Sequence, residues 1–369
     1  MARIAIGVCG EGRGHAARAL TLLERLGDRH EFLVASTSEA LALLSARAGA
    51  GRPSTRFLDV PGIRFEYVGG QIDVSRSIAA GLSYGWRRLP ALLDHVGRAL
   101  DDFGPDLVIT DFEPVLPRAA RQLDIPVVSV DHQHFLLAYD LRELPPGLRW
   151  QAKAMGLAVR LYVRNAADTV VSAFFQPPLA RGWEHVVQVG PLLRGAVLAA
   201  EPSAGGHVVS YLRPHTPPAV LEALAACGLP VRVYGLGGRE SCGAMSFHEI
   251  DEPRFVADLA ACTAVVAAGG NQLIGEALHL GKPLLALPES AHAEQHMNGH
   301  FLRGMGCGDF VPLERVDADR VRAFLGGLDR YRPALAARAG RMDGAGDVLR
   351  VIERRLPVSA AAAARPAAA

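Results

Sequence analysis

The stretch from Ala264 to Leu280 constrains the fold more than any other part of this chain. Residues 264–268 are all alanine or valine, a run typical of a strand that is buried on both faces of a parallel sheet. Gly269 and Gly270 follow, and glycine lets the backbone turn tightly and approach a ligand without an intervening Cβ. A helix is predicted from about Asn271 to Leu280, and the unbonded N–H groups of its first turn form an anion site. The pattern predicts an α/β domain that binds an anion at a helix start.

Polar side chains on and after this helix extend the candidate site. Asn271 and Gln272 open the helix, and Glu276 lies about one and a half turns into it, because one turn takes about 3.6 residues. A carboxylate there can accept hydrogen bonds from two ribose hydroxyls, which together with the anion site predicts a nucleoside-diphosphate ligand. Glu294 and Gln295 come next. The alternative is structural: the glycines only tighten a turn, and the glutamates and Gln295 face water.

The N-terminal segment repeats this plan of strand, glycine turn and helix. Residues 3–9 form a short apolar run, and Gly10, Gly12 and Gly14 precede a helix that is predicted from about Ala16 to Leu26. A dinucleotide-binding loop would carry its third glycine one residue later, with an acidic residue about twenty positions further on. An NAD site therefore stays open as an alternative that the spacing matches poorly.

His15 is the ionisable residue at the start of this first helix. The positive end of the helix dipole favours the neutral imidazole, which can accept a proton. His15 is therefore a candidate general base. The competing interpretation is a structural histidine that packs in a cleft or lies on the surface.

Short apolar runs alternate with helical segments along the whole chain, which predicts an α/β fold of two Rossmann-like domains with parallel sheets facing across a cleft. Gly190 and Pro191 mark the expected boundary. The predicted division is residues 1–189, residues 190–356 and a disordered tail at 357–369. The predicted strands are Ile4–Cys9, Phe32–Ala35, Leu107–Thr110, Val127–Val130, Val208–Tyr211, Val231–Tyr234, Ala264–Ala267 and Leu284–Leu287.

Carboxylates and imidazoles follow two predicted strands of the first domain. Asp111 and Glu113 come after one strand, and Asp131 and His134 come after the next. Such groups beside a cleft can act as a general base or orient one. A metal site is the alternative, but the contiguous pattern around His134 lacks the spacing of a zinc motif. A third interpretation is that some of these side chains cap the segments that follow.

Loops of the second domain supply further candidate ligand contacts. Arg213 follows a predicted strand and can pair with a phosphate. Gly235 follows the next strand, where backbone N–H groups can approach a diphosphate. Each of these can also be a plain connecting loop. Asp317 and Asp319 have the spacing of a Mg²⁺-binding carboxylate pair, but they lie where a helix N-cap is expected.

Composition excludes some classes of protein. Lys and Arg number 39 against 38 Asp and Glu, so no global basic field indicates a nucleic-acid partner. The 5 cysteines form no C-x-x-C pair and no cluster with histidine, which favours free thiols in a reducing cytoplasm. No signal peptide is evident, and no apolar run reaches the roughly 18 residues of a membrane span. A cytoplasmic protein is expected.

The ordered set from Gly269 to Gln295 resembles the donor-binding segment of GT-B glycosyltransferases that use nucleotide sugars. The loop from Gly10 to His15 resembles that of bacterial glycosyltransferases similar to the peptidoglycan lipid II N-acetylglucosaminyltransferase. It is more similar to a bacterial and archaeal GT-B family with a G-E/D-G-x-G-H start. The resemblance covers the chain from Arg3 to about Leu313. It also rests on residues 59–63, 106–114, 128–134 and 189–191.

This resemblance implies transfer of a sugar, with inversion, from a uridine or thymidine diphosphate sugar to an acceptor hydroxyl. It implies that Glu276 holds the donor ribose, that Glu294 and Gln295 contact sugar hydroxyls, and that the main chain near Ile250 contacts the base. His15 is the first choice of base, and the reserves are Asp111, Glu113 and His134. Neither a metal nor another cofactor is expected.

Two other functions stay open on the same residues: a sugar-nucleotide epimerase and a non-catalytic nucleotide-sugar binding protein. The acceptor is expected to be a lipid-linked glycan or a small metabolite. Residues 149–164 predict a basic amphipathic helix. It is either a core helix whose cationic face is solvated or a helix whose cationic face touches anionic lipid. The second interpretation would place the protein peripherally at the inner face of the membrane.

Overall fold

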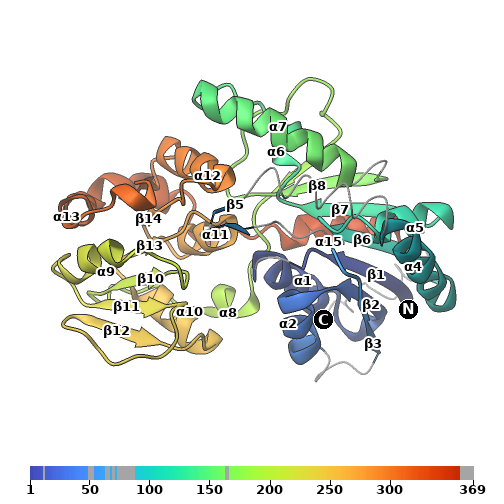
Figure 1. Cartoon of the computed structure of the whole chain (residues 1–369), viewed down its shortest axis with the longest axis horizontal. Helices are drawn as coiled ribbons and strands as arrows, with labels where there is room; N and C mark the ends of the chain where they lie inside the picture. Colours follow the sequence, from blue (N-terminus) through green and yellow to red (C-terminus); the bar gives the residue numbers. More distant parts are fainter. Residues whose placement is uncertain are drawn as a thin grey trace, which may run out of the picture. The chain divides into compact units, whose positions relative to one another are not determined.

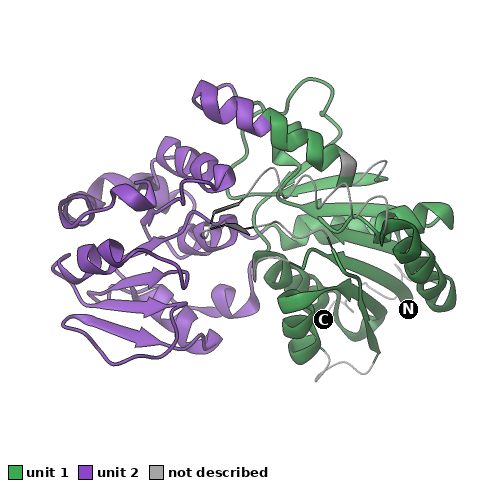
Figure 2. Cartoon of the chain, in the orientation of Figure 1, with its two compact units in different colours: residues 1–141, 153–192, 344–369 green, residues 142–152, 193–343 purple. Residues whose placement is uncertain are grey.

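The computed structural model describes residues 1–10, 13–48, 54–62, 67–68, 71–72, 88–162 and 166–357. The chain divides into two compact units (Figure 2). Unit 1 comprises Met1–Leu141, Lys153–Leu192 and Gly344–Ala369, and unit 2 comprises Arg142–Ala152 and Leu193–Asp343. Each unit is built on its own parallel sheet (Figure 1), which confirms the predicted α/β class with two parallel sheets.

The sheet of unit 1 has seven strands in the order β3-β2-β1-β6-β7-β8-β9, and every neighbouring pair is parallel. A separate antiparallel pair joins β4 and β5. The chain adds β2 and β3 on one side of β1, and then β6 to β9 in order on the other side. The strand order therefore reverses between β1 and β6. The strands are β1 (Ala2–Val8), β2 (His30–Ser36), β3 (Thr55–Asp59), β4 (Tyr67–Val68), β5 (Gln71–Ile72), β6 (Leu107–Asp111), β7 (Val127–Asp131), β8 (Asp168–Ser172) and β9 (Val187–Val189).

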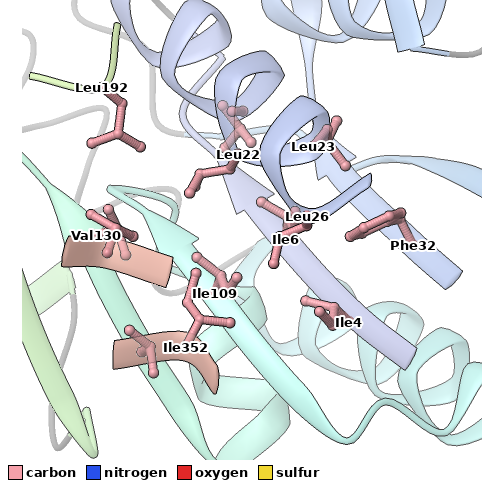
Figure 3. Close-up of a cluster of buried hydrophobic side chains, with 14 of the residues drawn as sticks. Ile4, Ile6, Leu22, Leu23, Leu26, Phe32, Ile109, Val130, Leu192 and Ile352 are labelled. Carbon is pink, nitrogen blue, oxygen red and sulfur yellow. The ribbon is translucent and has the colours of Figure 1, made fainter. Parts of the chain in front are cut away.

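Two apolar layers cover this sheet because successive strand residues point to opposite faces. Ile4 and Ile6 of β1 pack in one cluster with Leu22 of the first helix (Figure 3), whereas Ala5 packs in the other cluster with Leu100. The described helices of unit 1 are α1 (Arg13–Leu26), α2 (Ser38–Ala48), α4 (Leu89–Phe103), α5 (Leu116–Gln122), α6 (Phe135–Ala138) and α15 (Ala345–Arg355), with the 3-10 helix η1 (Gly27–Arg29). Helix α7 (Pro146–Tyr162) contributes residues to both units.

The sheet of unit 2 has six parallel strands in the order β12-β11-β10-β13-β14-β15. Its order reverses between β10 and β13. The strands are β10 (Val208–Tyr211), β11 (Val231–Tyr234), β12 (Met245–His248), β13 (Ala264–Ala267), β14 (Leu284–Ala286) and β15 (Gly308–Phe310). The helices are α8 (Gly195–Ala199), α9 (Pro218–Ala225), α10 (Glu252–Ala261), α11 (Asn271–His279), α12 (Ala293–Gly304), α13 (Ala318–Gly326) and α14 (Arg332–Ala336), with the 3-10 helices η3 (Leu313–Arg315) and η4 (Leu328–Tyr331).

All eight predicted strands are present, and three of them, β10, β11 and β13, have the predicted bounds. The sequence analysis missed β3, β8, β9, β12 and β15 of the two parallel sheets and the short antiparallel pair β4 and β5. Four of these, β3, β9, β12 and β15, lie at the edges of the parallel sheets. An edge strand is partly exposed, so it lacks the continuous apolar run that identifies a central parallel strand.

The C-terminal helix corrects the predicted domain limits. Residues 190–356 were expected to form one domain, but α15 belongs to unit 1. Its side chains Val348, Val351 and Ile352 are buried in the same cluster as Ile4. An amphipathic helix shows which of its faces is buried but not which sheet buries it, so the sequence could not assign α15. The disordered tail was predicted at residues 357–369, of which 358–369 lie outside the described residues.

Candidate functional site

In unit 1, His15 and Asp111 meet at the point where strand order reverses. Asp111 is the last residue of β6, and His15 lies in the first turn of α1, which follows β1. Because β1 and β6 are parallel neighbours, both segments emerge at the same edge of the sheet. The His15 Nδ1 atom lies 2.8 Å from the Asp111 Oδ1 atom. In open α/β sheets, ligands bind at such a reversal point.

Asp111 is also held by Arg18 from the next turn of α1. The Arg18 Nε and Nη2 atoms donate hydrogen bonds of 2.8 and 3.0 Å to the two Asp111 oxygens. Burial opposes ionisation of Asp111, but Arg18 and His15 outweigh it and hold the pKa of Asp111 below its usual value. A charged Asp111 favours the His15 tautomer that donates from Nδ1, which leaves the Nε2 lone pair to accept a proton.

Glu113, a reserve base in the sequence analysis, serves the fold. Its two carboxylate oxygens accept hydrogen bonds of 2.8 and 2.7 Å from the backbone N–H groups of Val115 and Leu116 at the start of α5. Burial raises the pKa of Glu113 to about 7, although these two hydrogen bonds oppose the shift. This arrangement is the capping role that the sequence analysis kept as an alternative.

Asp131 and His134 form a second histidine–carboxylate pair at the end of β7. The His134 Nδ1 atom lies 2.6 Å from Asp131 Oδ2, and the His134 backbone N–H donates to Asp131 Oδ1 at 2.9 Å. The Ser129 hydroxyl also donates to Asp131. Burial opposes both charges, but the pairing lowers the pKa of Asp131 to about 2 and raises the pKa of His134. Both side chains are buried.

In unit 2, the glycine turn after β13 leads into α11 as expected. The helix begins at Asn271, and Gly270 at its N-cap offers no side-chain cap to the first N–H groups. A Cβ on Gly269 would lie 2.9 Å from the Gln295 backbone oxygen, so packing requires glycine there. A Cβ on Gly270 would meet none of the described atoms within 4 Å. Gly269 therefore serves the packing, whereas Gly270 leaves space over the helix start.

Glu276 is buried on α11, so it is not a solvated helix carboxylate. The Arg194 guanidinium forms a bidentate pair with it, with Nε–Oε1 and Nη2–Oε2 distances of 3.0 and 2.7 Å. Gln272 donates a third hydrogen bond, of 3.2 Å, to Oε1. Arg194 also pairs with Glu252 at 3.1 Å. The sequence analysis missed Arg194, which stands in no motif and whose pairing only the fold reveals.

The remaining predicted ligand residues of unit 2 lie in loops at strand ends. Arg213 follows β10, and its Nη1 atom lies 3.4 Å from Oε1 of Glu289. Gln295 is buried, and its side-chain oxygen accepts a hydrogen bond from the Glu289 backbone N–H. Glu294 lies in the first turn of α12. Ile250 is exposed in the loop before α10.

Three further glycines, Gly12, Gly14 and Gly235, were predicted to contact the ligand. Gly235 has a φ of 89°, and a Cβ there would collide with the Leu212 backbone oxygen, so this turn requires glycine. Gly14 lies in the first turn of α1, and a Cβ on it would meet none of the described atoms within 4 Å. Gly12 lies outside the described residues.

Residues 2–329 match the sequence profile of glycosyl transferase family 1. The chain belongs to this family. A Methanosarcina mazei protein named an uncharacterized glycosyltransferase is 27% identical over 339 residues, which cover 83% of this chain and 84% of that protein. A Methanosarcina acetivorans protein of the same name is 23% identical over 394 residues, covering 96% and 98%.

Solved structures of glycosyltransferases share the fold. Arabidopsis thaliana UGT89C1, complexed with UDP-L-rhamnose, matches with a TM-score of 0.69 and 16% identity, covering 96% of this chain and 99% of that one. The calicheamicin glycosyltransferase CalG4 matches with a TM-score of 0.67 and 17% identity, covering 96% and 98%. The family 1 protein described here is therefore a glycosyltransferase with a GT-B fold.

The described residues contain neither a candidate membrane span nor a candidate metal centre. None of the described helices is both long and apolar enough to cross a membrane. Within the same residues, no three His, Cys, Asp or Glu side chains are grouped so that they could hold a metal ion.

Proposed function

We propose that this glycosyltransferase transfers a sugar from a uridine or thymidine diphosphate sugar to an acceptor hydroxyl, with inversion and without a metal ion. The observation that carries the proposal is the His15–Asp111 pair at the strand reversal of unit 1. It provides an oriented imidazole with one nitrogen available for a proton. A carboxylate that holds the other nitrogen orients the imidazole and fixes its tautomer for general-base catalysis.

The proposed reaction is a single displacement. The acceptor oxygen attacks the anomeric carbon while the bond from that carbon to the diphosphate oxygen breaks. The hydroxyl proton passes to Nε2 of His15, and the buried Asp111 carboxylate stabilises the imidazolium that forms. The electron pair of the broken bond leaves with the diphosphate. Because one displacement occurs at one face of the carbon, the configuration inverts.

Unit 2 supplies the proposed donor contacts. The N–H groups at the start of α11 and the Arg213 guanidinium face the diphosphate, and Gly270 leaves room for it. Glu276 accepts the ribose hydroxyls, which requires the ribose to share or replace the Arg194 contact. We assign sugar contacts to Glu294 and Gln295 and a base contact to the main chain near Ile250. Support comes from UGT89C1, whose solved structure is a complex with UDP-L-rhamnose.

We also propose a lipid-linked glycan or a small metabolite as the acceptor. A lipid-linked acceptor would fit a relationship to the lipid II N-acetylglucosaminyltransferase and contact with the inner face of a membrane. Helix α7 supports contact with a membrane, because it carries the basic residues Arg149 and Lys153 and exposes 72% of the apolar side chain of Trp150. Binding to vesicles with and without anionic lipid tests it, and equal partition of Trp150→Ala and wild type would contradict it.

Mass spectrometry after incubation with UDP-, dTDP- and GDP-sugars and a cell extract tests the proposed reaction. We expect a glycosylated product and free nucleoside diphosphate with a uridine or thymidine donor, in EDTA as well as in Mg²⁺. Activity that EDTA abolishes and Mg²⁺ restores would contradict the metal-independent mechanism. An altered sugar on an intact nucleotide would identify an epimerase, and binding without any turnover would identify a binding protein.

A further inference from the structure

Phe112 has a backbone conformation that bulky residues rarely adopt. Its φ is 53°, in the left-handed region. Within the described part of the chain, the other non-glycine residues with positive φ are Ser38 and Asp124. Their short polar side chains can form local hydrogen bonds, whereas a phenylalanine cannot. Glycine or asparagine would make this turn at lower cost, so the phenyl ring itself needs an explanation.

The residues on both sides of Phe112 are fixed. Asp111 is held by Arg18 and His15, and Glu113 caps α5 through its carboxylate. The chain must pass from the end of β6 into α5 between these two anchors. This accounts for the left-handed turn but not for a phenylalanine in it.

The Phe112 ring is nearly parallel to two aromatic rings that come from two other segments of unit 1. It is stacked on Tyr162, at the end of α7, with a centroid distance of 4.5 Å and an interplanar angle of 8°. It is nearly parallel to the His15 ring, at 6.4 Å and 15°. All three side chains are only partly buried. The strained turn therefore keeps accessible aromatic surface next to the candidate base.

We propose that Phe112, supported by Tyr162, is the platform on which the acceptor lays the flat apolar face of a ring that carries the attacking hydroxyl. Stacking on a fixed ring holds the acceptor ring parallel to Phe112. A hydroxyl at the edge of the acceptor ring is then directed towards His15. The ligand class is a planar phenol or the C–H face of a pyranose, since both present a flat apolar surface. This inference rests on the proposed function, because it gives the attacking hydroxyl to an acceptor bound beside His15.

Calorimetry with two probes, 2-naphthol and phenyl β-D-glucopyranoside, tests the platform without any donor or turnover. We expect wild type to bind at least one probe, Phe112→Trp to retain binding, and Phe112→Asn and Tyr162→Ala to bind at least tenfold more weakly. Asparagine tolerates the left-handed turn, so the melting temperature of Phe112→Asn should equal or exceed that of wild type. The preferred probe distinguishes a phenolic acceptor from a glycan.

Trp183→Ala is the matched control. It removes another aromatic–histidine stack of unit 1, the Trp183–His185 pair with centroids 5.8 Å apart, and it should leave probe binding unchanged. No binding of either probe to wild type, equal affinity in Phe112→Asn, or equal weakening in Trp183→Ala would each overturn the platform. The proposed function is judged separately, by product formation, so a failure of one does not imply a failure of the other.

Discussion

The Nδ1 atom of His15 lies 2.8 Å from the Oδ1 atom of Asp111, although 96 positions separate the two residues in the chain. Two parallel neighbouring strands, β1 and β6, bring them together at one edge of the sheet. Arg18 donates a hydrogen bond to the same carboxylate, so Asp111 is held in place and in turn orients the imidazole of His15.

Replacing His15 with alanine should lower turnover by about 10²–10⁴-fold, the usual contribution of a positioned proton acceptor. UDP affinity should hardly change, because the proposed diphosphate contacts lie in unit 2. Asp111→Asn should also lower turnover, because an amide does not enforce the required tautomer, and it should reduce stability because the buried ion pair between Arg18 and residue 111 is lost. Steady-state kinetics and calorimetry on soluble protein check both. A folded His15→Ala protein with near-normal turnover would contradict the assignment.

Glu276→Ala should weaken the binding of UDP and dTDP. Hydrogen bonds to a charged acceptor contribute about 1.5–3 kcal/mol each, so losing the proposed ribose contacts should raise Kd by at least tenfold. Arg194 keeps Glu252 as a partner in this variant, which limits the loss of stability. Glu222→Ala, at an exposed helix position of the same unit, is the control and should bind nucleotide normally. Unchanged Kd in Glu276→Ala would remove Glu276 from the site.

Gly269→Ala and Gly270→Ala should separate packing from ligand binding. The new Cβ at residue 269 would press against the Gln295 backbone oxygen, so this variant should melt at a lower temperature. The Cβ at residue 270 meets none of the described atoms within 4 Å, so this variant should keep its melting temperature and lose UDP affinity. Thermal melting and calorimetry give the two readouts. Equal UDP affinity in Gly270→Ala and wild type would show that the ligand does not approach this turn.

The Asp131–His134 pair should make stability depend on pH. The pKa of Asp131 is lowered from 3.8 to about 2, so its contribution is complete above 3.8 and is lost as pH falls towards 2. The pKa of His134 is raised above 6.5, so its contribution is complete below 6.5 and is lost as pH rises through the raised value.

Denaturant unfolding of wild type and Asp131→Asn at about pH 3, 5.5 and 8.5 measures this effect. The free energy of unfolding should differ most near the middle value, by about 2 kcal/mol, the amount that the Asp131 shift implies. A difference that does not vary with pH would mean that the pair is not charged in the folded protein.

The sequence alone determined most of the central strands, although not β8, and the helices that follow the two glycine segments. These signals are local: residues 264–267 are apolar on both faces, and Gly269 and Gly270 precede a helix start whatever the rest of the chain does. The same local pattern identified His15 and Glu276 as candidates. It could not tell that Glu113 caps a helix, because capping depends on the direction in which the side chain turns.

Only the tertiary structure decided which of these residues meet. The sheet order placed Asp111 beside His15, and the fold of unit 2 paired Glu276 with Arg194, 82 positions away. It also assigned α15 to unit 1, because an apolar helix face can be buried by any complementary sheet. Contacts between distant residues depend on strand order and helix packing, which are properties of the whole domain, and no local run of sequence specifies them.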